Sequence, residues 1–423
     1  MSAPQLSPIN HQPIPPGYKQ TEIGVIPAEW EVKRLGEVAT IATGNTPPTS
    51  DVSNYGDEFL FVGPVDMGEA KFISKTEKML SKKGFAMSRR FPKDSILFVS
   101  IGSTIGKCGI APVDLTSNQQ INAVFPSPSF SADYLFYAVC TAAPRIRAQA
   151  GEQAVPIVNK TQFLETAVAF PHLPEQRAIA TALSDVDGLL GGLNRLIAKK
   201  RDLKQAAMQQ LLTGQTRIPG FHEEWAETAL GNIGNFKNGL NKDSSAFGHG
   251  SPFVNLMDVF GVNAVSSTSH LGLVASTKLD QEVYDLRKGD VLFIRSSVKP
   301  SGVGLTAVVE CDLTETVYSG FLIRFRDCGV LDGGFKKHCF YAEGFRKQII
   351  AASSVSANTN INQNALRVLT LLLPPTKEEQ TAIAEVLTDM DAELAALERR
   401  REKTRALKQA MMQELLTGRT RLV

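Results

Sequence analysis

Residues 175–217 read EQRAIATALSDVDGLLGGLNRLIAKKRDLKQAAMQQLLTGQTR, and residues 379–421 read EQTAIAEVLTDMDAELAALERRREKTRALKQAMMQELLTGRTR. The two segments are 204 residues apart and share 25 of 43 aligned residues without a gap. Agreement over this length identifies an internal repeat, which has to be recognised before any local element is interpreted. The chain therefore alternates two variable units with two copies of one constant segment.

A weaker repeat joins the variable units, at an offset of 195 residues. The matching residues are Trp30, Leu35, Gly36, Val38, Gly44, Lys93, Leu97 and Phe98 with Trp225, Leu230, Gly231, Ile233, Gly239, Lys288, Leu292 and Phe293. The frame is shared, whereas most of the other residues differ. We therefore expect one scaffold that occurs twice with two different surfaces.

The repeat is circular. After the first constant segment the chain continues through Ile218-Pro219 to Trp225, whereas the second copy stops at Val423. The continuation that the second copy lacks stands at the beginning of the chain, as Ile26-Pro27 followed by Trp30. We therefore expect the two ends of the chain to lie near each other in space.

Each constant segment carries apolar residues spaced alternately by four and three, the pattern of a coiled-coil seam. These helix-packing candidates are Ile179, Leu183, Val186, Leu190, Leu193 and Ile197 in the first copy, and Ile383, Leu387, Met390, Leu394 and Leu397 in the second. Pro174 and Pro374-Pro375 stand at the starts, and Gly214 and Gly418 at the ends, as is typical of helix boundaries. The pattern predicts two helices of about 38 residues, roughly 57 Å long.

So narrow an apolar stripe does not stabilise an isolated helix, and the natural partner is the other copy. A pseudo-twofold relation between the units would make the pair antiparallel. The alternative is a surface helix that docks on its own domain. Gly191-Gly192 in the middle of the first copy weakens the coiled-coil interpretation, because glycine lowers helix propensity.

The variable units have the pattern of mixed α/β domains. Apolar runs at Ser95–Val99, Val291–Ile294 and Phe321–Phe325 predict strands between Gly, Pro and Asp turns. Tyr134–Cys140 and Phe345–Ala351 are expected to form short helices. The expected fold class is therefore α+β, with two mixed domains separated by two long helices packed as an antiparallel coiled coil.

Composition is that of a folded chain with more than one core. The 423 residues are 43% apolar and 21% charged, and the formal net charge is +2. Because positive and negative charges nearly balance, a nucleic-acid surface would have to be local. Five cysteines without a C-x-x-C pair suggest a reducing cytoplasm. No apolar run is long enough to span a membrane, and residues 1–20 do not resemble a secretory signal.

Catalytic motifs are weak. Gly102–Lys107 is one residue short of a phosphate loop, and Cys108 replaces its Ser/Thr. Asp66, Glu69 and Lys71 are too close in sequence for a nuclease triad, and His338-Cys339 has no neighbouring pair of metal ligands. Dinucleotide and amino-methyltransferase motifs are missing. These observations predict a non-catalytic chain without a metal site.

Local positive charge is the remaining signal. The first unit has a run of Lys71, Lys75, Lys78, Lys82, Lys83, Arg89, Arg90 and Lys93, and the second has Arg287, Lys288, Arg295, Lys299, Lys336, Lys337, Arg346 and Lys347. Lys and Arg would bind phosphates, while polar side chains in neighbouring loops would read bases. The alternative is a solvated face with ordinary turn chemistry.

The candidate DNA-contacting residues come from these runs and from polar loops between the expected strands. The loops are Thr43–Ser50, Ser100–Lys107 and Asn118–Asn122 in the first unit, and Asn238–Ser245 and Arg295–Ser301 in the second. The candidates are Asn45, Thr46, Lys78, Lys82, Lys83, Arg89, Arg90, Ser103, Thr104, Lys107, Asn118, Gln119, Asn238, Asn241, Lys242, Arg295, Ser296 and Lys299.

An ordered set of motifs carries a family resemblance over nearly the whole chain. It comprises YKQTEIGVIP at 18–27 with Trp30, Thr43–Pro47, Ile105-Gly106-Lys107, and the paired EQ-x-AIA and LKQA-x-MQ-x-LLTG segments. This set resembles the specificity subunit of type I restriction-modification systems. The second unit departs from the pattern, with Val303-Gly304 in place of Gly-Lys and Leu240-Asn241-Lys242 in place of Thr-Pro.

The resemblance implies a function. Each variable unit would be a target-recognition domain that reads one half of a bipartite, asymmetric double-stranded DNA site. The helices would set the gap and dock two methyltransferase subunits. S-adenosylmethionine would lie in those partners, ATP and magnesium in up to two restriction subunits with motor and nuclease activity, and no cofactor in this chain. Rods of roughly 57 Å suit half-sites about one helical turn apart.

The expected domain order follows from the repeat and the resemblance. It is an N-terminal extension at 1–20, recognition domain 1 at 21–173, spacer helix 1 at 174–214, recognition domain 2 at 215–373, spacer helix 2 at 374–418 and a tail at 419–423. Two other functions stay open at this stage: a structural adaptor that uses its helices to join proteins, and a self-contained nuclease or methyltransferase.

Overall fold

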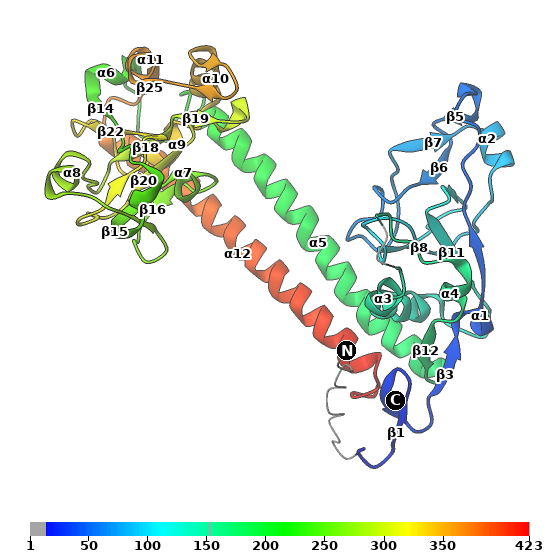
Figure 1. Cartoon of the computed structure of the whole chain (residues 1–423). Helices are drawn as coiled ribbons and strands as arrows, with labels where there is room; N and C mark the ends of the chain where they lie inside the picture. Colours follow the sequence, from blue (N-terminus) through cyan, green and yellow to red (C-terminus); the bar gives the residue numbers. More distant parts are fainter. Residues whose placement is uncertain (1–13, 152–153, 423) are drawn as a thin grey trace. The chain divides into compact units, whose positions relative to one another are not determined.

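A computed structural model describes residues 14–151 and 154–422, and the chain divides into two compact units (Figure 1). Unit 1 combines the residues up to Arg195 with those from Arg399 onward, and unit 2 spans Leu196–Glu398. Each unit therefore takes a part of both long helices, which the expected linear order of domains did not include. None of the described helices has the length and apolar character that crossing a membrane requires.

The two long helices agree with the prediction. Helix α5 runs from Leu173 to Leu211 and α12 from Lys377 to Leu415, 39 residues each. Pro174 lies in the first turn of α5, where its missing N–H costs no hydrogen bond. Gly214 and Gly418, which follow the two helices, have the same positive φ of 69°, as is common just after a helix end.

Unit 1 is built on a four-stranded sheet of order β4-β11-β8-β9, with a second sheet of order β10-β6-β7-β5. Its elements are β1 Tyr18–Thr21, β2 Gly24–Pro27, β3 Glu31–Arg34, α1 Leu35–Val38, β4 Ala39–Thr43, η1 Val52–Asn54, β5 Tyr55–Gly56, β6 Phe59–Val62, β7 Lys78–Leu80, α2 Lys82–Met87, β8 Ile96–Val99, β9 Cys108–Ile110, β10 Thr116–Ser117, β11 Ile121–Pro126, α3 Ala132–Ala148, α4 Lys160–Leu164 and β12 Ala167–Phe170.

Unit 2 repeats this plan with the sheet β14-β22-β18-β20-β16 and the smaller sheet β17-β15-β21. Its elements are β13 Ala226–Ala229, α6 Leu230–Ile233, β14 Gly234–Asn238, η2 Ser244–Ala246, β15 Phe247–Val254, α7 Leu256–Val259, β16 Ala264–Val265, β17 Gly272–Val274, α8 Lys278–Val283, β18 Val291–Ile294, β19 Ser296–Ser297, η3 Pro300–Gly302, β20 Thr306–Val309, β21 Val317–Tyr318, β22 Leu322–Asp327, α9 Lys336–Cys339, α10 Glu343–Ala351, β23 Ser354–Val355, β24 Thr359–Asn360, α11 Gln363–Val368 and β25 Thr370–Leu373.

The offset of 195 residues is a structural equivalence. Strand β3, helix α1, and strands β4 and β8 begin and end 195 residues before β13, α6, β14 and β18. The expected strands are also present, with small shifts at their ends, as β8, β18 and β22, and the expected helix Phe345–Ala351 is α10. Tyr134–Cys140 lies inside α3, which is longer than expected, with 17 residues. The prediction of one scaffold that occurs twice is therefore confirmed.

The apolar stripe of each long helix has two partners. Near the start of α5, Ile179 and Leu183 lie in the core of unit 1, and near the start of α12, Ile383 and Leu387 lie in the core of unit 2. The alternative of docking on the helix's own domain thus holds for this part. Of the eleven stripe residues, Ile179, Leu183, Leu193, Ile197, Ile383, Leu387 and Leu394 are buried, and Val186, Leu190, Met390 and Leu397 are half-buried.

Farther along, the helices pair with each other in antiparallel order. In unit 2, Lys200 bonds Glu393 and Lys204 bonds Asp391, so partners later in α5 meet earlier residues of α12. In unit 1, Lys408 Nζ lies 2.6 Å from Asp187 Oδ1. Asp187–Lys408 and Asp391–Lys204 are the same pair under the 204-residue repeat, as a pseudo-twofold relation requires.

The described segments nearest the two ends of the chain meet in unit 1, in agreement with the circular repeat. Tyr18 Oη donates to the Gly418 carbonyl at 2.9 Å. The Arg421 guanidinium bonds both oxygens of Glu175, and the indole N–H of Trp30 donates to the same carboxylate at 3.2 Å. In unit 2 the arrangement recurs with Arg217, Trp225 and Glu379. Residues 1–13 lie outside the described part of the chain.

The two units differ at one buried position beside the long helix. Tyr137 of α3 bonds Ser184 and Asp187 of α5, and in unit 2 His338 contacts Thr388, which corresponds to Ser184. Burial lowers the pKa of His338 to about 4, from 6.5. Asp391 opposes this shift, whereas the cations of Lys204 and Lys337 assist it. The folded state therefore holds a neutral imidazole.

We expect acid to destabilise unit 2 through this histidine. The unfolded imidazole binds its proton near pH 6.5, before the folded one does, so stability is full above pH 6.5 and falls as the pH approaches 4. The loss is about 3 kcal/mol at pH 4. Thermal unfolding of His338→Gln against the wild type should show a smaller pH dependence between pH 6.5 and 4. Identical dependences would contradict the assignment.

Candidate nucleic-acid interface

Three candidate loops of unit 1 begin at one edge of its central sheet. Strand β11 pairs Asn122 with Thr43 of β4 and Ile121 with Val99 of β8, so the loops after β4 and β8 and the loop before β11 meet there. The Asn122 side chain is buried; it accepts from Thr43 Oγ1 and donates to Ser100 Oγ, both at 2.7 Å. This amide fixes the three loops relative to one another.

Gly44 permits the closest approach between two of these loops. A Cβ at this position would lie 2.2 Å from Ser117 Oγ and 2.3 Å from the Asn118 carbonyl oxygen. Gly239 has the same role in unit 2, where a Cβ would lie 2.1 Å from the Ser319 carbonyl oxygen. The glycine match that the sequence showed therefore marks a shared junction of loops.

We expect Gly44→Ala to lower the free energy of unfolding of unit 1 by about 1–3 kcal/mol, because the loop at Ser117-Asn118 has to move. Urea denaturation of the whole chain measures this change. Gly68→Ala is the matched control, since a Cβ there meets nothing within 4 Å. Equal stabilities of the two variants would show that the junction is not tight.

Polar candidates of unit 1 bond one another across the junction. Thr46 Oγ1 donates to Gln119 Oε1 at 2.8 Å, and Asn45 Oδ1 accepts from the Arg89 amide at 2.5 Å. The Arg89 side chain donates to the Thr43 carbonyl at 2.5 Å. Asn118 bonds Gln120 through both its side-chain oxygen and its side-chain nitrogen. Asn45 and Asn118 thus serve the turns, while Thr46, Gln119 and Arg89 are exposed.

The basic run is less uniform than the sequence suggested. Lys78, Lys82 and Lys107 are exposed, and no salt bridge holds them within the part of the chain that the structure describes. Lys83 pairs with Asp51 and Arg90 with Asp114 at the surface. These surface pairs contribute little to stability.

Lys71 does not belong to this surface. Its side chain is 7% exposed; its Nζ lies 2.6 Å from Asp133 and 2.8 Å from Ser184, among the rings of Phe72, Phe136 and Tyr137. The tertiary fold places it between α3 and α5, where it joins a side-chain network. The part of the charge-run prediction that included Lys71 is wrong.

The loop after β8 is a turn of its own. Gly102 and Gly106 have φ of 97° and 102°, and the Gly106 amide closes the loop onto the Val99 carbonyl at 3.1 Å. Ser103 is exposed and Thr104 half-buried. In unit 2 the corresponding bond runs from Gly304 to Ile294 at 2.7 Å. Gly304 therefore corresponds to Gly106, and Leu305 takes the place of Lys107.

The candidates of unit 2 surround the equivalent edge. Asn238 is the last residue of β14. Asn241 packs against Gly320, so closely that a Cβ added to Gly320 would lie 1.8 Å from the side-chain oxygen of Asn241. Lys242 bonds Asp280 at 3.0 Å, and Arg295 donates to the Gly320 carbonyl at 3.3 Å. Ser296 lies in β19, and Lys299 is exposed.

The second half of the unit 2 basic run is held inside the unit. Lys336 and Asp327 form an ion pair that is almost completely buried, and Lys337 bonds Glu310. Arg346 donates to the carbonyls of Ser301 and Val303. Only Lys347 is widely exposed, and it pairs with Glu343. This run stabilises the fold and does not form a cationic face, which corrects the prediction for this segment.

The residues of the suspected nuclease triad lie with separate partners. Asp66 accepts the amides of Gly63 and Glu77, which shapes a turn, and Glu69 pairs with Arg405 of α12. Lys71 is buried as described. Within residues 14–151 and 154–422, no group of three or more His, Cys, Asp or Glu side chains could hold a metal ion.

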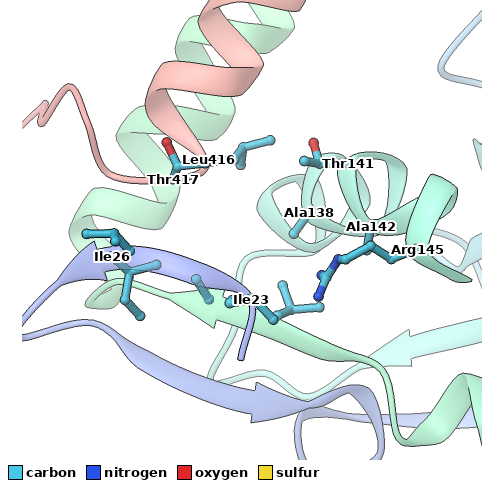
Figure 2. A pocket seen from close by; sticks show the side chains of 11 residues that line it. Ile23, Ile26, Ala138, Thr141, Ala142, Arg145, Leu416 and Thr417 are labelled. Carbon is cyan, nitrogen blue, oxygen red and sulfur yellow. The ribbon is translucent and has the colours of Figure 1, made fainter. Parts of the chain in front are cut away.

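Two small cavities occupy repeat-related places. One, of about 110 Å³, lies where α3 meets the end of α12, with Ile23, Ile26 and Leu416 among its lining residues (Figure 2). The other, of about 140 Å³, includes Leu212, which corresponds to Leu416. Both are smaller than the roughly 300–1,000 Å³ of ligand pockets, so neither suits a cofactor.

Comparison with known proteins gives one consistent result. The family described as "Type I restriction modification DNA specificity domain" matches residues 27–199 and 222–405. The MjaIX specificity subunit of Methanocaldococcus jannaschii is 31% identical over 179 residues, 41% of each chain. The MjaVIII specificity subunit of the same organism is 23% identical over 94% of each chain.

Solved structures show the same fold. The S subunit of a type I restriction-modification system from M. genitalium has a TM-score of 0.56 and 16% identity, covering 91% of this chain and 96% of its own. A chain from a study of complex assembly and conformational transition of the type I R-M system has a TM-score of 0.60 and 20% identity, covering 93% and 99%.

Proposed function

This chain belongs to the type I restriction-modification DNA specificity family, and on that basis we propose that it selects the DNA site for a methyltransferase and restriction complex. Unit 1 reads one half of a bipartite, asymmetric double-stranded site, and unit 2 reads the other half. One observation carries this proposal: equivalent loops leave the same edge of the same sheet in both units, yet carry different side chains. One scaffold with two loop sets suits two different half-sites.

Thr46 stands just after β4, with Pro47 behind it, whereas Leu240-Asn241 follows β14. Lys107 in unit 1 is replaced by Leu305 in unit 2. Exposed Lys and Arg side chains bind phosphates and set the register, and polar loop residues read base edges. The contact residues come from the eighteen candidates named from the sequence, with Thr46, Gln119 and the exposed lysines first among them, while Asn45 and Asn118 shape the turns.

The long helices serve as the spacer and as docking sites for two methyltransferase subunits. Those partners hold S-adenosylmethionine, and up to two restriction subunits hold ATP and magnesium. The chain itself is non-catalytic, which is supported by the separate partners of Asp66, Glu69 and Lys71. The complex acts in the cytoplasm. The two recognition domains have the boundaries expected from the sequence. The last part of α5 belongs to unit 2, and the last part of α12 belongs to unit 1.

Mapping methylated adenines in a host that carries this chain and its methyltransferase tests the proposal. The expected result is a two-part asymmetric motif with a fixed gap. Exchanging residues 21–173 for those of a relative should change one half of the motif and leave the other half and the gap intact. The purified chain should neither cut nor methylate DNA, with magnesium or with methyl donor, until the methyltransferase is added. A change in both halves, or activity of the chain alone, would contradict the proposal.

A further inference from the structure

A short β-hairpin of unit 2 has surface chemistry that the candidate residues above do not include. Strands β23 and β24 pair Ser354 with Asn360 and Val355 with Thr359, and Ser356–Asn358 connect them. Strand β24 also pairs with β19, which follows the end of β18. The hairpin is therefore attached to the candidate loop Arg295–Ser301.

The base of the hairpin is packed into unit 2, and its tip is exposed. Ile361 is buried in the core of unit 2, and its amide donates to the Arg295 carbonyl at 2.9 Å. Thr359 is also buried. Val355 is 77% exposed, and Ser356, Ala357 and Asn358 are exposed as well. A firmly anchored ribbon with a solvent-facing tip is suited to enter a groove.

The composition of the segment favours contact with a polyanion that is read by hydrogen bonds. Residues 353–360 contain three Ser, two Asn and one Thr and no charged residue, and residues 344–376 contain no Asp or Glu. Asn and Ser side chains both donate and accept, as base edges require. Exposed Lys299 and half-buried Arg295 on the adjoining loop are available for phosphates.

The register places polar side chains side by side. Ser296, Asn360 and Ser354 are direct neighbours across the three strands and share one face of this small sheet. Ser296 is already a candidate DNA-contacting residue, and the strand pairing places Asn360 and Ser354 beside it. At the tip, Asn360 Nδ2 donates to the backbone carbonyl of Asn358, so this hydrogen bond does not use the side chain of Asn358.

Unit 1 has different chemistry at the equivalent place. Ile157 pairs with Ile101 in the loop after β8, and the Val158 amide donates to Ser100, as Ile361 does to Arg295. Val155 and Ile157 are exposed apolar residues next to Pro156. Two readers of different half-sites require such a difference at a shared position.

We propose that the hairpin Ser354–Asn360 enters the major groove of the half-site read by unit 2, where Asn358 contacts a base edge and Val355 contacts a thymine methyl group. The inference rests on the proposed function and adds specificity residues to it. A two-stranded ribbon fits the major groove, and Asn makes a bidentate contact with adenine there. Apolar side chains recognise the thymine methyl.

The test uses the complete complex with its methyltransferase and a duplex that carries the mapped site, with every base pair of both half-sites replaced in turn. Asn358→Ala should weaken binding roughly tenfold or more and relax preference at one position of the unit 2 half-site only. Replacing Ser356–Asn358 by Asn-Gly keeps a hairpin turn and removes the tip, and should have at least the same effect. Asn364→Ala, exposed on α11, is the matched control and should bind as the wild type does.

The outcomes separate the two proposals. Wild-type affinity and base preference in both hairpin variants would overturn the hairpin contact and leave the proposed function standing. Equal weakening on every sequence would also overturn it, because the hairpin would then touch only the backbone. A wild-type complex without preference for any site would overturn the proposed function itself.

Discussion

Arg421→Ala, a change two residues before the end of the chain, is expected to lower the free energy of unfolding of unit 1 by about 3 kcal/mol. The Arg421 guanidinium bonds both oxygens of Glu175, whose side chain is 1% exposed. Without arginine, this buried carboxylate keeps only the Trp30 N–H among these partners. A buried charge that loses its counter-ion is far more costly than the loss of a surface pair. Urea denaturation followed by circular dichroism measures the effect.

The chain offers two controls for this prediction. Arg419→Ala should change stability by less than about 0.5 kcal/mol, because Arg419 is 68% exposed and 3.8 Å from Glu414. Arg217→Ala should destabilise unit 2 about as much as Arg421→Ala destabilises unit 1, since Arg217 makes the same bonds to Glu379. If Arg421→Ala unfolds at the wild-type denaturant concentration, the Glu175 cluster does not stabilise unit 1.

The triple variant Lys78→Gln, Lys82→Gln, Lys107→Gln is expected to weaken binding of the complex to its DNA site on the order of a hundredfold at physiological salt. Each exposed lysine that contacts a phosphate releases counterions, so the slope of log K against log salt should decrease in magnitude by roughly 0.9 per contact. Filter binding or fluorescence anisotropy at salt concentrations from about 50 to about 200 mM measures both the affinity and the salt slope.

The matched control removes the same charge elsewhere. Lys160, Lys199 and Lys403 are exposed on α4, α5 and α12, and their triple change to Gln should leave the salt slope near that of the wild type. Size-exclusion chromatography confirms that each variant still assembles with the methyltransferase. Equal losses in both triple variants would mean that bulk charge, and not the position of Lys78, Lys82 and Lys107, attracts DNA.

Much of the fold could be predicted, since long helices with a regular apolar stripe and clear end signals are the strongest pattern in a sequence. Arg421 and Arg217 occupy the same place in the 204-residue repeat, and the structure gives them equivalent bonds. The apolar stripe alone did not show which part of each helix packs on a domain core and which part packs on the other helix. Whether Ile179 contacts a domain core or the other helix depends on what the tertiary fold brings beside it.

The site could be predicted only in outline. The loops were found because Gly, Asn and Ser cluster between apolar strands, yet Lys71 was misplaced, because its partners Asp133 and Ser184 are distant in sequence. Gly304 escaped notice as the match of Gly106, because the loop after β18 has a different length and shifts the offset. The sequence patterns did not single out Ser354–Asn360, because its importance depends on strand pairing with Ser296-Ser297.

The closure of unit 1 by the last residues of the chain has a consequence for biosynthesis. Domains usually fold in the order in which the ribosome makes them. Unit 2 is one continuous stretch, Leu196–Glu398, whereas unit 1 needs the segment from Arg399 onward, including Arg421. The half that is translated first is therefore completed last, once the segment that follows unit 2 has been made. A premature stop codon shortly after the codon for Glu398 would leave a finished second half joined to an unfinished first one.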